Sequence, residues 1–117
     1  MAPSRDGPVR RGDIWTVAAG TGYTGKPRPA IIVQSDRFDR TASVTICPLT
    51  RSDAPLTFVR FKVAASADSG LLVDSWAMVD KIVTVPTTKL GYRIGRLDRS
   101  SLVTLNQALA TFLGLAD

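Results

Sequence analysis

The sequence contains no histidine, and all ten of its acidic residues are aspartate, so glutamate is absent as well. Histidine is the usual general base near neutral pH and a common zinc ligand, so neither role can be filled by imidazole. The single cysteine, Cys47, excludes an internal disulfide and a cysteine metal cluster. We therefore predict no metal and no cofactor. Any catalysis has to rest on Arg, Lys, Asp, Ser, Thr, Tyr or Cys47.

Long apolar runs are also missing. No stretch approaches the roughly 20 apolar residues of a membrane helix, and the arginines of the opening MAPSRDGPVRR precede no apolar core of a secretory signal. We expect a cytoplasmic protein with no membrane association. At 117 residues the chain is the size of one domain. Residues 1–9, with two prolines and a glycine, are expected to form a flexible arm, and residues 10–117 the folded domain.

Positive charge exceeds negative charge, with 15 Lys and Arg against 10 Asp and a formal net charge of +5. This balance favours an anionic partner, with nucleic acid first, although a merely basic surface fits the same numbers. The cations form no dense run. A positive site therefore has to be assembled by folding.

Hydrophobic patterning predicts a mainly β domain. Runs rich in Val and Ile, separated by Gly, Pro and polar turns, predict strands at residues 14–18, 30–34, 43–49, 56–63, 71–80 with an extension to 85, and 92–97. The unbroken apolar character of 30–34 predicts burial on both faces. Cys47 lies in such an apolar run and is interpreted as a buried structural thiol, with a reactive cysteine as the second choice.

The C-terminal segment has a different period. Leu102, Leu105, Leu109 and Phe112 recur at helical spacing, either Asp98 or Ser100 is placed to cap the start, and Gly114 follows the end. Six or seven short strands followed by one amphipathic helix predict a small SH3-like antiparallel β-barrel closed by the helix. A barrel would hide the sheet edges of so short a chain.

Five blocks in order resemble one protein family. They are residues 11–15 (RGDIW), 26–36 (KPRPAIIVQSD), 44–50 (VTICPLT), 70–82 (beginning GLLVDS) and 95–97 (GRL), together spanning most of the chain. The sequence resembles the MazF/PemK-like toxins of the CcdB/MazF superfamily. The resemblance implies a ribosome-independent, metal-independent endoribonuclease that cuts single-stranded RNA at short motifs and leaves 2′,3′-cyclic phosphate and 5′-OH ends.

The same resemblance implies the catalytic residues. The key arginine of the family corresponds to Arg28, between two prolines, and the key threonine to Thr50, at the end of the Pro-Leu-Thr strand. The chemistry is consistent, because the planar fork of an arginine matches two phosphate oxygens and a threonine supplies a short neutral donor. Taken alone, Arg28 would read as a loop charge and Thr50 as a hydroxyl capping the next turn.

One position departs from the family pattern. Relatives often carry an acidic residue five positions before the arginine, and this chain has Tyr23 there. The general base is therefore open. Tyr23 is a candidate for stacking on an RNA base. Asp36 is a candidate acidic substitute, although it is equally a candidate helix cap, and either Ser35 or Asp36 is placed to cap a short helical turn.

Further RNA contacts are candidates from charge and loop position alone. Phosphate contacts are assigned to Lys26, Arg37, Arg51, Lys62 and Lys81, with solvated surface charge as the alternative for each. Ser52 is included as an RNA-binding candidate, although Ser52 and Asp53 also suit a simple turn. The loops 20–26 and 51–55 are expected to choose the RNA motif.

The resemblance also implies partners: an acidic, partly disordered MazE-like antitoxin and a second copy of the chain in a homodimer. The helix 102–113 and the segment 76–79 are candidates for either the core or the dimer interface. Two other functions stay open: a non-catalytic CcdB-like toxin, whose C-terminal tryptophan tail is missing from this chain, and a non-cleaving SH3-like RNA-binding module.

Overall fold

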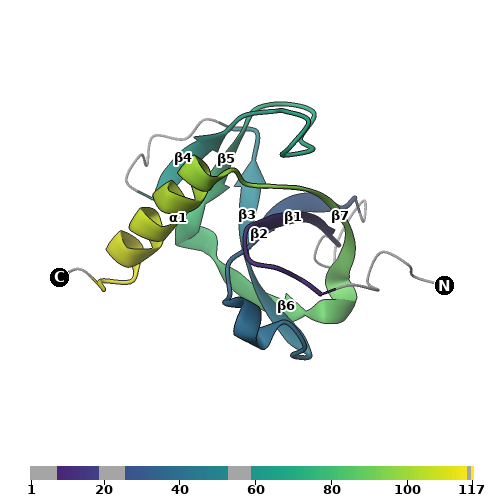
Figure 1. Cartoon of the computed structure of the whole chain (residues 1–117). Coiled ribbons are helices and arrows are strands. Elements are labelled where there is room, and N and C mark those ends of the chain that lie inside the picture. Colours follow the sequence, from purple (N-terminus) through teal and green to yellow (C-terminus); the bar gives the residue numbers. More distant parts are fainter. Residues whose placement is uncertain (1–7, 19–25, 53–58, 116) are drawn as a thin grey trace.

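Strands dominate the computed structural model, which describes residues 8–18, 26–52, 59–115 and 117. The elements in chain order are β1 (Asp13–Val17), β2 (Arg28–Ile32), the 3-10 turn η2 (Asp36–Phe38), β3 (Ser43–Thr50), β4 (Arg60–Val63), β5 (Ser75–Met78), η3 (Val79–Lys81), β6 (Val83–Pro86), η4 (Thr87–Lys89), β7 (Leu90–Arg96) and α1 (Arg99–Phe112). Figure 1 shows strongly curved strands with α1 packed on one side.

All strand pairings are antiparallel, and the hydrogen-bonded order is β4-β5-β3-β2-β1-β7, with β6 paired to β3 off this path. The long β3 changes partners along its length, because its first half pairs with β6 and its last two residues pair with β5. This exchange lets one strand serve two curved parts of the sheet. The mainly β class with one C-terminal helix is confirmed.

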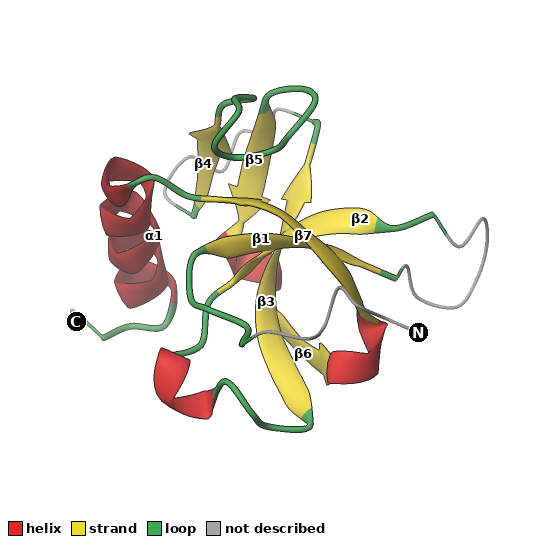
Figure 2. Ribbon diagram, turned by 45° about the vertical axis from the view of Figure 1, so that its right-hand side comes forward, coloured by secondary structure: helices red, strands yellow, loops and turns green. Residues whose placement is uncertain are grey.

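The expected closure into a barrel is not observed, because the two ends of the sheet, β4 and β7, are not paired with each other. The β4–β5 loop lies against β7 instead (Figure 2). The backbone N–H of Arg96 donates to the carbonyl of Asp68 at 2.8 Å. Two glycines permit this approach, since an added Cβ would come within 1.8 Å of Ile94 O at Gly70 and within 2.3 Å of Asp68 O at Gly95. The β4–β5 loop thus occupies the position at β7 that a paired strand would take in a closed barrel.

The same loop explains why the expected extended segment 71–80 was only partly right. Strand β5 is limited to Ser75–Met78, and Val79–Lys81 forms η3. The preceding turn is folded by Ser69, whose Oγ accepts from the N–H of Leu71 and donates to the carbonyl of Ala64. Side-chain hydrogen bonds of this kind compete with the sheet ladder. Of the expected strand 56–63, residues 56–58 lie outside the described residues, and β4 begins at Arg60.

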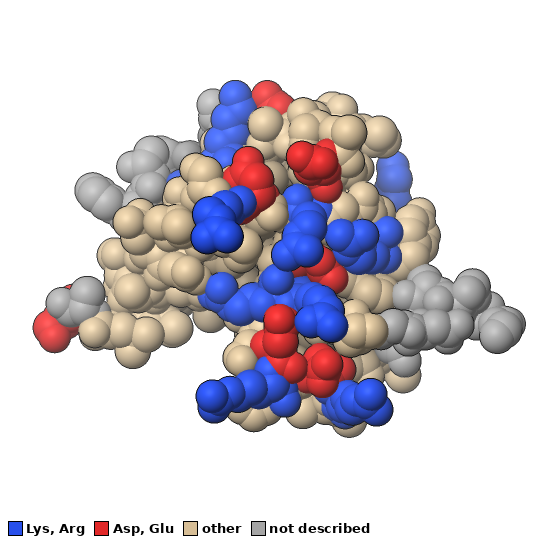
Figure 3. Space-filling model, viewed as in Figure 1, with Lys and Arg blue, Asp and Glu red and all other residues tan. Residues whose placement is uncertain are grey.

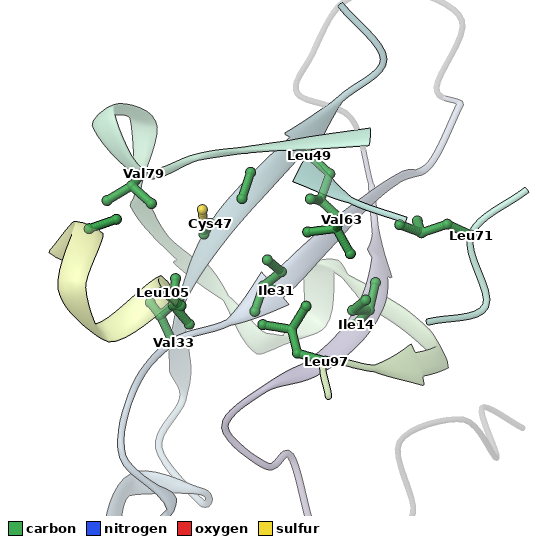
Figure 4. Packing of buried hydrophobic residues seen from close by; sticks show 12 residues of the cluster. Ile14, Ile31, Val33, Cys47, Leu49, Val63, Leu71, Val79, Leu97 and Leu105 are labelled. Carbon is green, nitrogen blue, oxygen red and sulfur yellow. The ribbon is translucent and has the colours of Figure 1, made fainter. Parts of the chain in front are cut away.

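The central strands are buried on both faces, as predicted for residues 30–34. One cluster of buried side chains lies between the sheet and α1 and includes Ile14, Ile31, Cys47 and Leu105 (Figure 4). A second cluster, which contains Trp15, Ala30, Ile32, Val44 and Ile46, forms on the opposite face. Neighbouring residues of one strand contribute to different clusters because side chains alternate across a sheet. Val9, the last residue of the expected arm, packs against the second cluster.

Capping residues mark both ends of the helix α1. Asp98 is the N-cap, and its carboxylate accepts from the N–H of Ser101 at 2.7 Å. Gly114 has φ +74°, the left-handed conformation that commonly follows a helix end. Leu105 and Ala108 of α1 are buried in the first cluster. At η2, Ser35 and not Asp36 is the cap, and its Oγ accepts from the N–H of Arg37.

We expect Leu105→Ala to lower the free energy of unfolding by about 2–5 kcal/mol, because a fully buried side chain would leave a cavity between α1 and the sheet. Chemical denaturation measures this loss. Gln107→Ala, on the exposed side of the same helix, is the matched control and should change stability by less than about 0.5 kcal/mol. Equal effects of the two variants would mean that α1 does not anchor the core.

Candidate functional site

A cavity of about 530 Å³ opens where β2 begins and β3 ends, and is lined by residues 16, 26–29, 49, 51, 70–73, 75, 92 and 94. Because β2 and β3 are antiparallel, the first residue of one and the last of the other lie at the same edge. Arg28 is the first residue of β2, and so stands in a strand and not in the expected loop. We call this cavity the strand-end cleft.

Three cations line the strand-end cleft: Lys26, Arg28 and Arg51. Among the described residues, no carboxylate lines it, and none forms an ion pair with Arg28 or Arg51. Both arginines are solvent-exposed. Arginines that form no ion pair with a described carboxylate contribute to a local positive potential, and guanidinium groups can pair with two oxygens of a phosphate.

Four cations elsewhere in the described chain form ion pairs. Arg60 donates to Asp80 through two bonds of 2.9 and 3.0 Å, and Lys62 lies 3.3 Å from Asp74. Other ion pairs join Arg93 to Asp13 and Arg10 to Asp36. On the face drawn in Figure 3, Asp side chains lie among the Lys and Arg side chains. The strand-end cleft differs from these places, because no described carboxylate is among its lining residues.

The hydrogen bond from Arg60 holds the pKa of Asp80 below its usual range, and the same contact raises the pKa of Arg60. The backbone N–H of Ala65, followed by Lys62, lowers the pKa of Asp74. Asp74 and Asp80 therefore stabilise the fold through these contacts.

Thr50 lies near the strand-end cleft but is not among its lining residues. The β2–β3 register pairs Ala30 with Pro48, and the same register extended by two residues aligns Arg28 with Thr50. The Oγ1 of Thr50 accepts from the N–H of Ser52 at 3.1 Å, so the threonine caps the turn after β3. An accepting hydroxyl still has its own proton to donate.

Several other predicted contacts lie outside the strand-end cleft. Asp36 accepts from the backbone N–H of Arg11 at 2.6 Å, beyond the opposite end of β2. Ser52 and Lys81 are exposed, and neither lines the cleft; Arg37 and Lys62 do not line it either. Tyr23, with most of the loop 20–26, lies outside the described residues, as does Asp53 with part of the loop 51–55.

The structure adds lining residues that the sequence did not single out. Thr16 comes from β1, Ser75 from β5 and Tyr92 from β7, while 70–73 belong to the β4–β5 loop. One sequence feature could have pointed to Tyr92 as a site residue: it is an aromatic residue followed by arginine in a strand that contains two glycines. No sequence feature pointed to Thr16 or Ser75, since single hydroxyl residues are common in strands.

Cys47 is not a functional group of the cleft. Burial raises the pKa of its thiol to about 12, so the thiolate is disfavoured and the interpretation as a structural thiol is confirmed. In the part of the chain that the structure describes, no three Cys or Asp side chains are grouped to hold a metal ion. Within the same residues no helix is long and apolar enough to span a bilayer.

Comparison with known proteins decides the family. Residues 10–113 match the model for PemK-like, MazF-like toxins of type II toxin–antitoxin systems. The chain belongs to this toxin family. Its sequence is 48% identical over 108 residues to a probable endoribonuclease MazF of Mycolicibacterium smegmatis, covering 92% of this chain and 99% of that protein. It is 34% identical to the endoribonuclease MazF9 of Mycobacterium tuberculosis, covering 92% and 98% of the two chains.

Solved structures agree with this MazF-like toxin fold. A mycobacterial endoribonuclease in complex with its cognate antitoxin superposes with a TM-score of 0.75 at 26% identity, covering 91% of this chain and 95% of that one. MazF from Deinococcus radiodurans reaches the same TM-score at 16% identity, covering 93% and 99%, and shows the fold alone. The open, loop-completed sheet described above is therefore a member of the MazF-like fold.

The ion pair between Arg60 and Asp80 of this MazF-like toxin generates a pH prediction. A carboxylate whose pKa is lowered on folding stabilises the protein above its unfolded pKa of about 4, and this contribution is lost as pH falls through the folded value. We expect the unfolding free energy to fall below pH 4, and to fall less steeply in Asp80→Asn. Denaturation at pH 7 and pH 3 measures both slopes, with Asp39→Asn as control, because Asp39 is half-buried and forms no described ion pair. Parallel wild-type and Asp80→Asn curves would contradict the assignment.

Proposed function

We propose that this toxin is an endoribonuclease that cuts single-stranded RNA at the strand-end cleft, with Arg28 as its central catalytic residue. The observation that carries the proposal is that Lys26, Arg28 and Arg51 line one cleft, that no described carboxylate lines it, and that Arg28 and Arg51 form no described ion pair. The sequence relatives support it, because both bear the name endoribonuclease and align over nearly their whole length. Action on cellular RNA would place the toxin in the cytoplasm.

The proposed reaction uses the RNA's own 2′-hydroxyl. The 2′-oxygen loses its proton and bonds to phosphorus, the bond from phosphorus to the 5′-oxygen breaks, and that oxygen takes up a proton, leaving a 2′,3′-cyclic phosphate and a 5′-OH. Negative charge gathers on the phosphate oxygens in between, and a fixed cation lowers the energy of that state. Arg28 begins a strand buried in both cores and has proline on either side, so its backbone is preorganised for this role.

The other groups have supporting roles in this proposal. Lys26 and Arg51 hold flanking phosphates and set affinity and salt dependence, not sequence choice. Thr50 supplies a hydroxyl donor at the same sheet edge as Arg28. The candidate contacts from Tyr23, Asp36, Ser52 and Lys81 remain proposals from the sequence. Arg28 stabilises charge in this mechanism and is not the base that accepts the 2′-proton, because a guanidinium group stays protonated in proteins.

Two partners complete the proposal. An acidic antitoxin would neutralise the strand-end cleft, and one solved relative is recorded in complex with its cognate antitoxin. A homodimer is proposed to use the apolar side chains that α1 leaves exposed, Val103, Phe112 and Leu113. Ala77 and Val79 of the other candidate interface segment are instead buried in the core of the single chain.

Replacing Arg28 tests the centre of the proposal. Arg28→Ala should lower the cleavage rate by at least about 100-fold, as for the loss of a transition-state donor. The assay is incubation of pure protein with a defined single-stranded RNA in EDTA, with the product ends identified by sequencing. Arg37→Ala, an exposed cation on η2 outside the cleft, is the control and should keep the wild-type rate.

Two results would count against this function. Wild-type cleavage by folded Arg28→Ala protein would exclude Arg28 as the catalytic residue. Wild-type protein that retards RNA but leaves it intact would favour a binding module, and protein that does neither would favour a CcdB-like toxin with a protein target.

Replacing Thr50 separates its two roles. Thr50→Val removes the acceptor for the Ser52 N–H and should cost about 1 kcal/mol of stability together with a loss of cleavage rate. Thr50→Ser retains the hydroxyl and should keep both. Stability comes from denaturation, and cleavage is measured where both variants are fully folded. A Thr50→Val protein that is less stable but cleaves normally would show that Thr50 only caps the turn.

A further inference from the structure

Tyr92 is the one aromatic side chain among the described residues that line the strand-end cleft. Its side chain is 58% exposed. The same cleft has an apolar wall from the β4–β5 loop, where Leu72 is 91% exposed although the loop is held by hydrogen bonds. A rigid site that presents an aromatic ring and an exposed leucine beside the exposed cations Arg28 and Arg51 suits a ligand with both flat apolar faces and negative charge.

The backbone at Tyr92 departs from regular sheet geometry. Between the pairs Trp15–Arg93 and Val17–Leu90, one residue of β1, Thr16, faces two residues of β7, Gly91 and Tyr92. This two-against-one arrangement is a β-bulge, a feature that turns a side chain away from its regular direction and that is frequent beside active sites.

The bulge is locked by a specific contact. The N–H of Tyr92 donates to the Oγ1 of Thr16 at 3.1 Å. Residue 91 has to be glycine for this contact, because a Cβ there would lie 2.2 Å from the same oxygen. Thr16 and Gly91 together fix the backbone that carries the ring of Tyr92 at the cleft.

We propose that Tyr92 is a specificity-determining residue that stacks on an unpaired base next to the scissile phosphate, and that Thr16 is its positioning residue. This inference rests on the proposed function. Nucleobases offer the flat apolar face that a tyrosine ring binds, and stacking on an aromatic side chain is worth roughly 1–3 kcal/mol per base. Lys26, Arg28 and Arg51 hold the phosphates while Tyr92 takes the base, so the substrate must be single-stranded there.

The test combines protein variants with altered RNA. Once a cleavage site has been mapped with wild-type protein, each nucleotide flanking the cut is replaced in turn by an abasic one, and kcat/KM is measured. We expect one position at which the abasic change lowers wild-type kcat/KM roughly 5- to 150-fold, the range that 1–3 kcal/mol implies. Tyr92→Ala should show a similar loss on intact RNA and little further loss with that abasic substrate, and Tyr92→Phe should stay within about threefold of wild type.

Control variants separate stacking from folding. Phe38→Ala removes an equally exposed aromatic ring from η2, outside the cleft, and should leave the abasic pattern unchanged. Thr16→Val should reduce the abasic penalty at the same single position, and Thr16→Ser should retain it, because only a hydroxyl accepts from the Tyr92 N–H. Thermal denaturation confirms that each variant is folded.

The outcomes distinguish this inference from the proposed function. If Tyr92→Ala cleaves intact RNA like wild type, or keeps every wild-type abasic penalty, the stacking role is overturned while cleavage by the toxin stands. If wild-type protein does not cleave RNA, the proposed function fails, and binding of fluorescein-labelled single-stranded RNA by wild-type and Tyr92→Ala protein then tests Tyr92 directly. Equal binding by the two proteins would overturn the stacking role.

Discussion

Burial of the central strands on both faces is the constraint on which the rest of the molecule depends. Ile31 points into one core, and Ala30 and Ile32 point into the other, so the middle of β2 has no surface left for a polar group. Functional side chains can stand only where strands begin, end or bulge. Arg28 and Tyr92 occupy two such positions, and the strand-end cleft forms where they meet.

The packing of the β4–β5 loop against β7 has two consequences, one for the sheet and one for the cleft. It lies along β7, which requires the missing side chains of Gly70 and Gly95, and thereby takes the place that a β4–β7 pairing would need in a closed barrel. Its outer turn, residues 70–73, then forms an apolar wall of the strand-end cleft. The open sheet and the apolar wall of the cleft therefore have the same structural cause, and in that cleft Arg28 and Arg51 form no ion pair with a described carboxylate.

Local patterns predicted those parts of the fold that local forces determine. The apolar run 30–34, the helical period from Leu102 to Phe112 and Gly114 at its end were all read correctly, because side-chain burial and capping act over a few residues. The expected strand 71–80 was wrong in part, because the turn held by the hydrogen bonds of Ser69 replaces the beginning of that strand. The candidate site was predicted unevenly: Arg28, Lys26 and Arg51 meet in the cleft, whereas Asp36 and Lys81 do not line it.

The sequence by itself determined that this chain is a mainly β toxin of the MazF-like family, that its core is two-sided, and that catalysis cannot use histidine. Only the tertiary structure decided which of its fifteen cations lie together without a described carboxylate, and that Thr16 holds Tyr92 from 76 residues away in the chain. The reason is physical. Composition and periodicity indicate which side of each segment is buried and which is exposed to water. A cleft depends instead on strand register, on a bulge and on the path of one loop across a neighbouring strand.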